Sequence, residues 1–427
     1  MAIGRREFLK WLSVGASASA LTACETRGAR NASSASARVV VLGGGYGGAT
    51  AAKYVNMWAP DIEVVLVERN SDFISCPLSN LVLAGNTTLQ ELTMGYGALS
   101  ARGVRVVRDE AVAVDPSRRE VRLARGGPIT YDRLIVSPAI DFIYDTIPGL
   151  KSPEAQRRIL HAWKAGEQTL ALRKQLEAMR DGGVYVLHIP LAPFRCPPGP
   201  YERVCQIADY FKRAKPRSKI IVLDTNDDII SKKGLFLAEW GGPYKGMIDY
   251  HPNSTLEDVD PASLTLKLTF DNVTGDVVNV VPPQRAADIA QKAGLVNTNE
   301  HWCAVDWQTC ESRNVPGIHV LGDATLSAPA MPKSATMANQ HGKLAAAAVI
   351  AKLKGQPVNR DPVIMNTCYS FVSGKAAMHV TSIHHYDAAQ KTLVQVKGAG
   401  GISDRSSELE GTYAWGWARN IWADALA

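Results

Sequence analysis

The 427-residue sequence lacks several patterns that would place it in common classes of protein. It has no run of about 18 apolar residues, so we expect no transmembrane helix. Its seven cysteines form no CxxC pair and no Cys/His cluster with metal spacing, which argues against a metal site. No CxxCH motif occurs, so this chain attaches no c-type haem. The net charge of +6 is spread out, and nucleic acid is not an expected partner.

The first residues have the features of an export signal. Arg5 and Arg6 lie in GRREFLKWL, a twin-arginine pattern, and the weakly apolar run WLSVGASASALTA follows. An amphipathic helix is the alternative, but this run lacks a period of about 3.6 residues. We predict a twin-arginine signal and linker at 1–37 and a periplasmic protein. Because Leu21–Cys24 also fits a lipoprotein processing site, Cys24 is either a lipidated membrane tether or part of a removed or linker segment.

A glycine-rich turn follows the first strongly apolar segment. The sequence VVVL at Val39–Leu42 predicts a buried parallel strand, and ATAAKYVNMW predicts the helix after the turn. Three glycines stand between them in G-x-G-x-x-G spacing: Gly43, Gly45 and Gly48. They permit a tight turn, backbone approach to a pyrophosphate and close packing of the helix. Glu68 ends the next strand and can accept hydrogen bonds from an adenosine ribose.

A second signal lies far downstream, in GIHVLGDA and the helix after it. This segment predicts a strand that ends in a Gly-Asp pair, and the Asp323 carboxylate can bind the ribityl chain of a flavin. The helix that follows Pro332 and Lys333 would direct its positive end at the flavin pyrimidine edge. Together with the first glycine motif, this pattern favours FAD over NAD as the tightly bound ligand.

The middle of the chain repeats the β–loop–helix–β order without a second glycine motif. Its loop, PLAPFRCPPGP, has one glycine, several prolines and Cys196. Proline has no N–H to donate to a pyrophosphate, so we predict no NAD(P)H site there. The predicted fold is α/β, with two Rossmann-like domains of the FAD/NAD-linked disulfide reductase type and a C-terminal α+β cap. The FAD-binding domain is split between 38–150 and 286–354, the second Rossmann-like domain is 151–285, and the cap is 355–427.

Several of these segments, with others, resemble the flavoprotein subunit of flavocytochrome c sulfide dehydrogenase. They include VVVLGGGYGGATAAKYV, CPLSN, APFRCPPGPYER, WCAVDWQTCES and MPKSATMANQHGKLAAAAV. The resemblance extends from about Arg38 to the C-terminus, and a more distant one points to sulfide:quinone oxidoreductases. It implies an enzyme that oxidises sulfide to sulfur or polysulfide with FAD. Its electrons would pass to a c-type cytochrome subunit, which carries the haem.

The resemblance also implies roles for three cysteines. Cys76, in SCPLSN, matches the position that joins the flavin 8α carbon through a thioether; an ordinary buried cysteine is the alternative. Cys196 and Cys368 match the family's redox-active disulfide, which sequence alone cannot pair. Hydrosulfide would attack this disulfide, and Cys368, by analogy, would pass the electrons to the flavin. Arg195 either attracts HS⁻ or is a surface arginine. The remaining cysteines are expected to be structural, with a second disulfide among them as the alternative: Cys205, Cys303 and Cys310.

Two other classes of function stay open. A sulfide:quinone oxidoreductase would use the same flavin and cysteines but would dock on the membrane. The aromatic tail EGTYAWGWARNIWADALA, with Trp415, Trp417 and Trp422, is compatible with such docking, although these residues also suit packing or a protein interface. A non-catalytic FAD-binding protein is the lesser alternative, and the three cysteines argue against it.

Overall fold

Short apolar segments from both halves of the chain form one seven-stranded sheet in this computed structural model, which describes residues 35–427. The strand order is β19-β20-β21-β9-β1-β2-β5. Its strands are β1 (Ala37–Leu42), β2 (Ile62–Glu68), β5 (Arg105–Arg108), β9 (Arg133–Val136), β19 (Val305–Asp306), β20 (Glu311–Ser312) and β21 (Ile318–Val320). Strands β21, β9, β1, β2 and β5 are parallel, and buried valines fill β1 because this part of the sheet is covered.

The register of this sheet brings three loops together. Leu42 and Val320 each pair with Val136, so β1, β9 and β21 end at the same edge. The glycine turn therefore lies near Asp323, although the two are far apart in the sequence. Ligands of parallel α/β sheets bind at such carboxyl edges.

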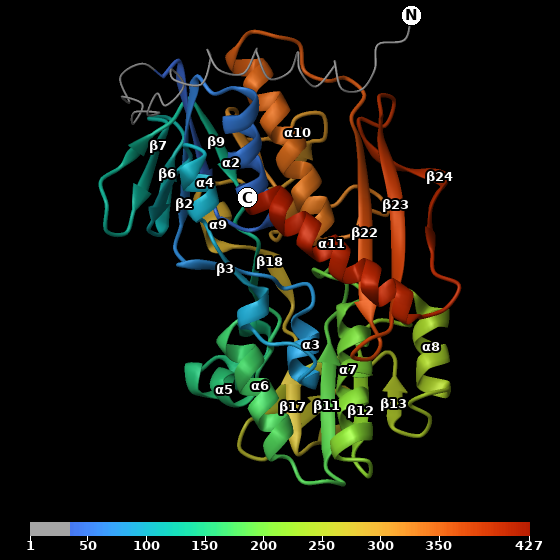
Figure 1. Ribbon diagram of the computed structural model, residues 1–427. Coiled ribbons are helices and arrows are strands. Elements are labelled where there is room, and N and C mark those ends of the chain that lie inside the picture. The colour runs from blue at the N-terminus through green and yellow to red at the C-terminus, as the bar shows by residue number, and fades with distance from the viewer. Residues whose placement is uncertain (1–34) are drawn as a thin grey trace, which may run out of the picture. The chain divides into compact units, whose positions relative to one another are not determined.

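Two helices pack closely beside this sheet, α2 (Tyr46–Trp58) and α10 (Ala335–Leu353), as the upper half of Figure 1 shows. Small residues allow the close approach. A Cβ on Gly342 would lie only 2.6 Å from the carbonyl oxygen of Gly47. The predicted split of the flavin-binding region thus corresponds to a sheet and a helix pair built from two distant segments; the domain boundaries themselves stay a prediction.

A second parallel sheet lies in the lower half of Figure 1 and has the strand order β13-β12-β11-β17. Its strands are β11 (Val184–Ile189), β12 (Lys219–Asp224), β13 (Ile248–His251) and β17 (Val277–Val280). Three helices accompany it: α6 (Glu167–Ala178), α7 (Gly199–Ala214) and α8 (Lys233–Gly241). A small antiparallel sheet is added by β14 (Leu256–Asp260), β15 (Thr265–Leu268) and β16 (Asn272–Thr274). The middle region is therefore Rossmann-like, as predicted.

From the sequence, the chain from about Glu154 to Met179 is expected to form one helical segment, and this expectation is wrong. The structure has α5 (Pro153–Arg158) and α6, separated by extended chain. The side chain of Arg203, which is buried, donates to the carbonyl oxygens of His161 (2.8 Å) and Ala162 (2.6 Å). These carbonyl groups therefore bind a side chain and take no part in a helix.

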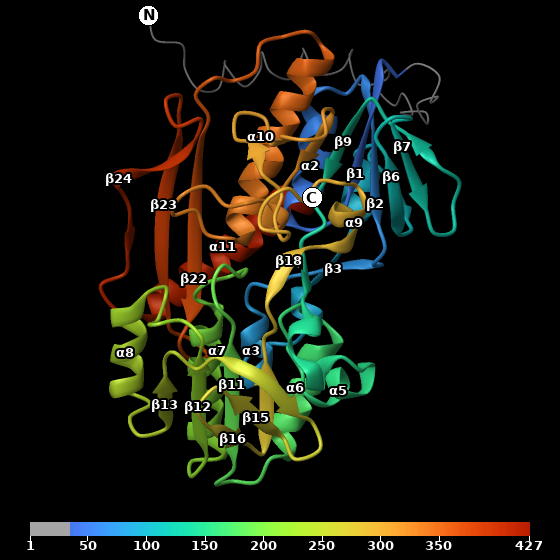
Figure 2. The same cartoon turned by 180° about the vertical axis from the view of Figure 1, so that it is seen from behind.

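The C-terminal region consists of an antiparallel sheet and a final helix, seen from behind in Figure 2. The strands β22 (Val363–Phe371), β23 (Ala377–Asp387) and β24 (Thr392–Ile402) are longer than the short strands expected from the alternating segments YSFVS and KTLVQVK. The helix α11 (Glu408–Leu426) carries the aromatic tail and reaches α2, where Tyr54 donates to Asp424 at 2.6 Å. This contact ties the end of the chain to the flavin-binding region.

Shorter elements connect these layers: α3 (Ser79–Ala84), α4 (Gly97–Ala101), α9 (Asp288–Lys292), β3 (Asp72–Ile74), β4 (Thr93–Gly95), β6 (Ala111–Asp115), β7 (Glu120–Leu123), β8 (Ile129–Thr130), β10 (Ile140–Phe142) and β18 (Gln284–Ala286). Within residues 35–427, no helix has the length and apolar character needed to cross a membrane. The predicted export signal and Cys24 lie outside the described residues.

Candidate functional site

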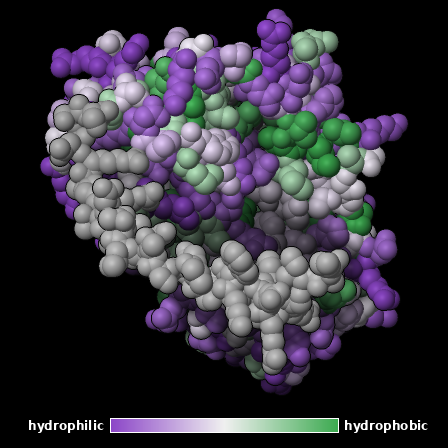
Figure 3. Space-filling view, turned by 45° about the horizontal axis from the view of Figure 1, so that its top comes forward, coloured by the Kyte–Doolittle hydropathy of each residue, from purple (hydrophilic) through white to green (hydrophobic). Residues whose placement is uncertain are grey.

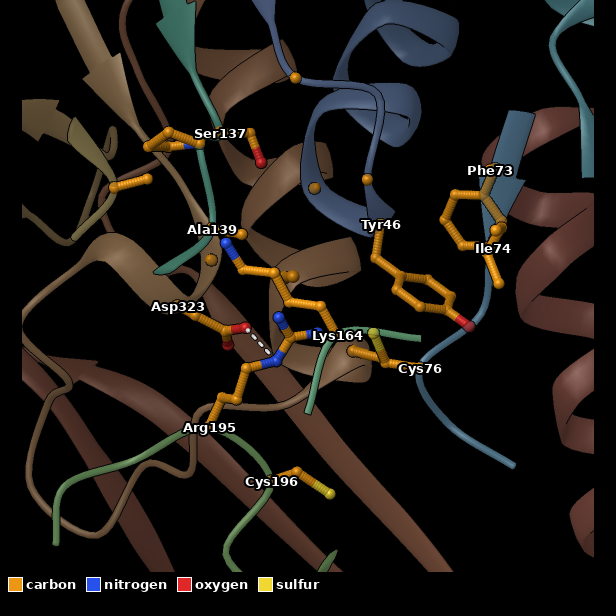
Figure 4. A pocket seen from close by; sticks show the side chains of 18 of the residues that line it. Tyr46, Phe73, Ile74, Cys76, Ser137, Ala139, Lys164, Arg195, Cys196 and Asp323 are labelled. Carbon is orange, nitrogen blue, oxygen red and sulfur yellow. Dashed lines mark ion pairs between the residues drawn. The ribbon is translucent and has the colours of Figure 1, made fainter. Parts of the chain in front are cut away.

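One cavity of about 420 Å³ brings together residues from all three regions of the fold. Its volume is in the range of small-molecule and cofactor sites. Eight of the nine predicted site residues line it: Gly43, Gly45, Glu68, Cys76, Cys196, Asp323, Lys333 and Cys368. The ninth, Gly48, packs against the turn, where a Cβ would lie 1.9 Å from the carbonyl oxygen of Gly43. Figure 4 shows part of this cavity.

The glycine turn leaves room for a phosphate group on its cavity side. Gly43 has φ +93°, and a Cβ there would lie 2.3 Å from the carbonyl oxygen of Ser137, so only glycine fits. A Cβ on Gly45, in contrast, would meet nothing within 4 Å. This exposed backbone precedes the N-terminus of α2, which provides the positive end of a helix dipole. The turn therefore fits the pyrophosphate of FAD.

Glu68 stabilises the turn and keeps capacity for a ligand. Its Oε2 atom accepts a hydrogen bond from the backbone N–H of Gly44 at 2.6 Å. Its Oε1 atom accepts from the backbone and side-chain nitrogens of Asn70, at 2.8 and 2.7 Å. Each carboxylate oxygen has two lone pairs, so Oε2 retains one for a ribose hydroxyl.

Asp323 presents a buried carboxylate oxygen that lacks a donor. Its Oδ1 atom has no hydrogen-bond partner among the residues that the structure describes, while Oδ2 lies 3.6 Å from Nε of Arg195. An unsatisfied buried acceptor costs about 1–3 kcal/mol. A ribityl hydroxyl of a flavin would satisfy this atom, so the residue fits the predicted ligand.

Lys333 lies on the cavity wall, but its ammonium group is held by the protein. Nζ donates to the backbone oxygen of Asp323 at 2.9 Å and lies 3.7 Å from the ring centroid of Trp302. Burial lowers the pKa of Lys333 to about 8. Its own carbonyl oxygen accepts from the backbone N–H of Cys196 at 2.8 Å. Lys333 therefore joins the flavin-binding segment to the loop that carries Cys196.

Arg195 lies within the cavity, so the surface-arginine alternative is wrong. Its side chain is 16% exposed, and Figure 4 shows it between Asp323 and Cys76. Burial lowers the pKa of Arg195, but interactions with the acidic groups Cys76, Asp323 and Cys196 outweigh this effect, and the net shift is upward. Arg195 is thus a fixed positive charge beside these groups. Cys76 itself accepts a hydrogen bond at Sγ from the backbone N–H of Ala165, at 3.4 Å.

The two predicted redox cysteines reach the cavity from different regions. Cys196 lies in the loop between β11 and α7, with φ +57°, and Cys368 lies in β22. Both are half-buried free thiols in this structure, so the disulfide is not formed here and stays a proposal. Burial raises the pKa of both thiols, and the charge of Cys368 further raises the pKa of Cys196.

The other three described cysteines are fully buried and do not line this cavity: Cys205, Cys303 and Cys310. Trp240 donates its indole N–H to Cys205 at 3.3 Å, which is consistent with a packing role.

Sequence reasoning missed two charged residues behind the redox cysteines. Glu202, in α7, accepts from the backbone N–H of Phe371 (3.0 Å) and from the side chain of Asn80 (3.3 Å). Burial raises the pKa of Glu202 to about 7. The second residue, Lys232, is also buried, at the N-terminus of α8. The signal for Glu202 was a carboxylate on the buried face of an otherwise amphipathic helix; Lys232 carried no signal in its local sequence.

Comparisons with known proteins decide the family. Residues 169–282 match the family model described as "Sulfide dehydrogenase [flavocytochrome c] flavoprotein chain, central", and residues 360–426 match "Flavocytochrome c sulphide dehydrogenase, flavin-binding". The flavoprotein chain from Chlorobaculum thiosulfatiphilum is 56% identical over 45 residues, which are 94% of that sequence and 10% of this chain. The chain belongs to this flavoprotein family.

More general relationships agree with this membership. Residues 37–175 match the pyridine nucleotide-disulphide oxidoreductase family. Mitochondrial sulfide:quinone oxidoreductase of Mus musculus is 24% identical over 327 residues, covering 72% of this chain and 69% of that sequence. The structure of sulfide:quinone oxidoreductase from Aquifex aeolicus shares the fold, with TM-score 0.73, 16% identity and 91% coverage of both chains. The protein is therefore an FAD-binding oxidoreductase of a sulfide-oxidising family.

Proposed function

We propose that this chain is a periplasmic sulfide dehydrogenase that acts through a Cys196–Cys368 disulfide and an FAD bound covalently at Cys76. Electrons would then pass to a c-type cytochrome subunit. One observation carries the proposal: the three cysteines line the same cavity as the glycine turn and the unsatisfied carboxylate of Asp323. A purely structural role would not require three half-buried thiols at one cofactor site.

The chemistry at the cysteines is thiol–disulfide exchange. HS⁻ attacks one sulfur of the disulfide, a new sulfur–sulfur bond forms, and the bond between Cys196 and Cys368 breaks. One cysteine then carries a persulfide, and the other leaves as a thiolate with the electron pair. Bound FAD supplies the acceptor for these two electrons. Arg195 provides the positive potential that attracts anionic HS⁻ into the cavity.

The cytochrome as acceptor is supported by the family and by the C-terminal helix. On α11, Trp417 lines the cavity while Tyr413 is 54% exposed on the surface. The helix therefore extends from the proposed cofactor site to the solvent. Periplasmic export rests on the twin-arginine pattern at Arg5 and Arg6, and a lipid tether rests on Cys24.

A sulfide:quinone oxidoreductase is the second candidate, because relatives and a solved structure with that name share the fold. Quinone reduction would require an apolar surface that enters the membrane. Figure 3 shows hydrophobic residues in separate patches on a largely hydrophilic face. On the helix of the aromatic tail, the large exposed hydrophobic residues are Leu409 and Tyr413.

Anaerobic mixing followed by an acceptor assay tests the proposed function. We expect sulfide to bleach the flavin absorbance rapidly and NADH not to do so, because the loop around Cys196 offers no pyrophosphate site. The reduced protein should then reduce a c-type cytochrome much faster than a short-chain quinone. Rapid bleaching by NADH would contradict the proposal, and preferential quinone reduction would support the second candidate.

A further inference from the structure

A buried ammonium group lies directly behind one of the two redox cysteines. Lys232 is 5% exposed and caps the N-terminus of α8 with φ +55°. Its Nζ atom donates to the hydroxyl of Ser370 at 2.8 Å and to the backbone oxygen of Cys368 at 3.0 Å, with a longer contact of 3.4 Å to the carbonyl oxygen of Met378. The side chain of Lys232 therefore reaches from the middle region to β22, the strand that carries Cys368.

All three acceptors of Lys232 are neutral. In the described part of the chain, its ammonium group forms no ion pair with a carboxylate. A buried charge without a counter-ion costs several kcal/mol. Burial lowers the pKa of Lys232 to about 8, and Cys368 is the nearby group that opposes this shift most strongly. A negative charge on Cys368 would therefore stabilise the buried ammonium group of Lys232.

The two thiols differ in the charge that faces them. After burial, the strongest influence on Cys196 is the carboxylate of Glu202, which raises the pKa of that thiol, while Arg195 and Lys232 lower it by less. After burial, the strongest influence on Cys368 is Lys232, which lowers the pKa of that thiol. A negative charge is therefore more stable on Cys368 than on Cys196.

We propose that Lys232 is a positioning residue that makes Cys368 the leaving thiolate of the redox pair and so directs HS⁻ to Cys196. This inference rests on the disulfide of the proposed function. The sulfur of HS⁻ bonds to Sγ of Cys196, the bond to Cys368 breaks, and the electron pair leaves on Sγ of Cys368. A thiol of lower pKa leaves faster in this exchange, so the electrostatic difference decides which sulfur is attacked.

The charged and titratable groups that face Cys368 come from three elements. They are Lys232 at the start of α8, Glu202 in α7 and Cys196 in the loop before α7. Glu410, in α11, acts on Lys232 from a greater distance. Removal of the Lys232 charge takes away the cation that acts most strongly on Cys368 and leaves the Glu202 carboxylate facing it, so its thiolate should become less stable.

Site-resolved alkylation of the reduced, flavin-loaded protein tests this proposal. Iodoacetamide labelling of each cysteine is followed against pH by mass spectrometry, and the pH midpoint reports the thiolate independently of how accessible the thiol is. In the natural protein we expect a lower midpoint for Cys368 than for Cys196. Lys232→Met should raise the Cys368 midpoint by about one pH unit or more, while Lys232→Arg should retain it.

The neighbouring Lys233 provides the matched control. Its side chain is 53% exposed and pairs with Asp228, so Lys233→Met should leave both midpoints unchanged. An unchanged Cys368 midpoint in Lys232→Met would overturn the proposal. If that variant does not fold, the natural protein alone decides, because a lower midpoint for Cys196 would also overturn it.

The sulfur atom itself gives a second, separate readout. After one equivalent of sulfide is added without an acceptor, the extra sulfur should be found on Cys196, and sulfur on Cys368 would contradict the inference. Sulfur on neither cysteine would contradict the proposed function, whereas the alkylation midpoints test Lys232 without any turnover. The two failures are therefore distinguishable.

Discussion

Nε of Arg195 lies 3.6 Å from Oδ2 of Asp323, although one residue precedes a redox cysteine and the other follows a strand of the flavin-binding sheet. This pair fixes the loop of the middle region against the proposed cofactor site. It also leaves Oδ1 of Asp323 for a ligand and places a positive charge in the cavity.

Arg195→Met should weaken the use of sulfide while the flavin remains bound. Loss of the buried positive charge removes the attraction for HS⁻, and we expect kcat/KM for sulfide to fall about tenfold or more, the size of a charged hydrogen bond. Steady-state kinetics at several salt concentrations measure this effect. The control is Arg217→Met, since the Arg217 side chain is 77% exposed. Equal kinetics for both variants would show that the charge of Arg195 does not contribute to the use of sulfide.

Flavin attachment at Cys76 is tested by denaturation in acid. Yellow colour and flavin fluorescence should stay with the polypeptide, because a thioether survives unfolding. In Cys76→Ala the FAD should still bind through the glycine turn but should be released by acid. Release of all flavin from the natural protein would show that Cys76 is an ordinary buried thiol.

Asp323→Asn should weaken noncovalent FAD binding, best seen together with Cys76→Ala. The amide is neutral and can present a donor where the unsatisfied Oδ1 now lies, so we expect affinity to fall by about 1–3 kcal/mol. Flavin retained after dialysis measures this loss against Cys76→Ala alone. Full retention would indicate that Asp323 serves only to hold Arg195.

Glu202 should make stability depend on pH in a specific window. Its pKa rises from 4.5 in the unfolded chain to about 7 on folding, so the native state binds more protons between these values. Stability therefore decreases as pH rises through this window, by at most about 1.4 kcal/mol per pH unit. Glu202→Gln should remove this contribution. We expect the difference in Tm, variant minus natural protein, to increase from pH 4.5 to 7 and then level off; a constant difference would contradict the assignment.

Patterns that depend on neighbours in the sequence predicted much of this fold. The turn Gly43–Gly48, the strand ending at Glu68 and the Gly-Asp pair at Asp323 are local, and the parallel register places them at one edge. The absence of a second glycine motif is likewise a local feature, because it can be seen within the single loop around Cys196. These features could be predicted because each strand, turn and helix carries its own periodicity or glycine signal.

Features built by tertiary packing could not be predicted in this way. The break between α5 and α6 depends on Arg203, which binds carbonyl groups some 40 residues earlier in the chain. The ammonium of Lys232 and the carboxylate of Glu202 meet the redox cysteines only because α7, α8 and β22 converge. A single charged residue that is buried only by tertiary packing cannot be distinguished in the sequence from a charged residue on the surface.

The central claim is that sulfide reduces the flavin through Cys196 and Cys368, and single-turnover reduction of the natural protein and three variants tests it most directly. Cys196→Ser and Cys368→Ser lack a sulfur that can be attacked or can leave, whereas Cys205→Ala alters only a buried thiol outside the cavity. Anaerobic mixing with sulfide should bleach the flavin of the natural protein and of Cys205→Ala. Both serine variants should remain oxidised with sulfide, keep their Tm and be reduced only by dithionite. Bleaching at the natural rate in either serine variant would contradict the disulfide mechanism and indicate direct attack of sulfide on the flavin.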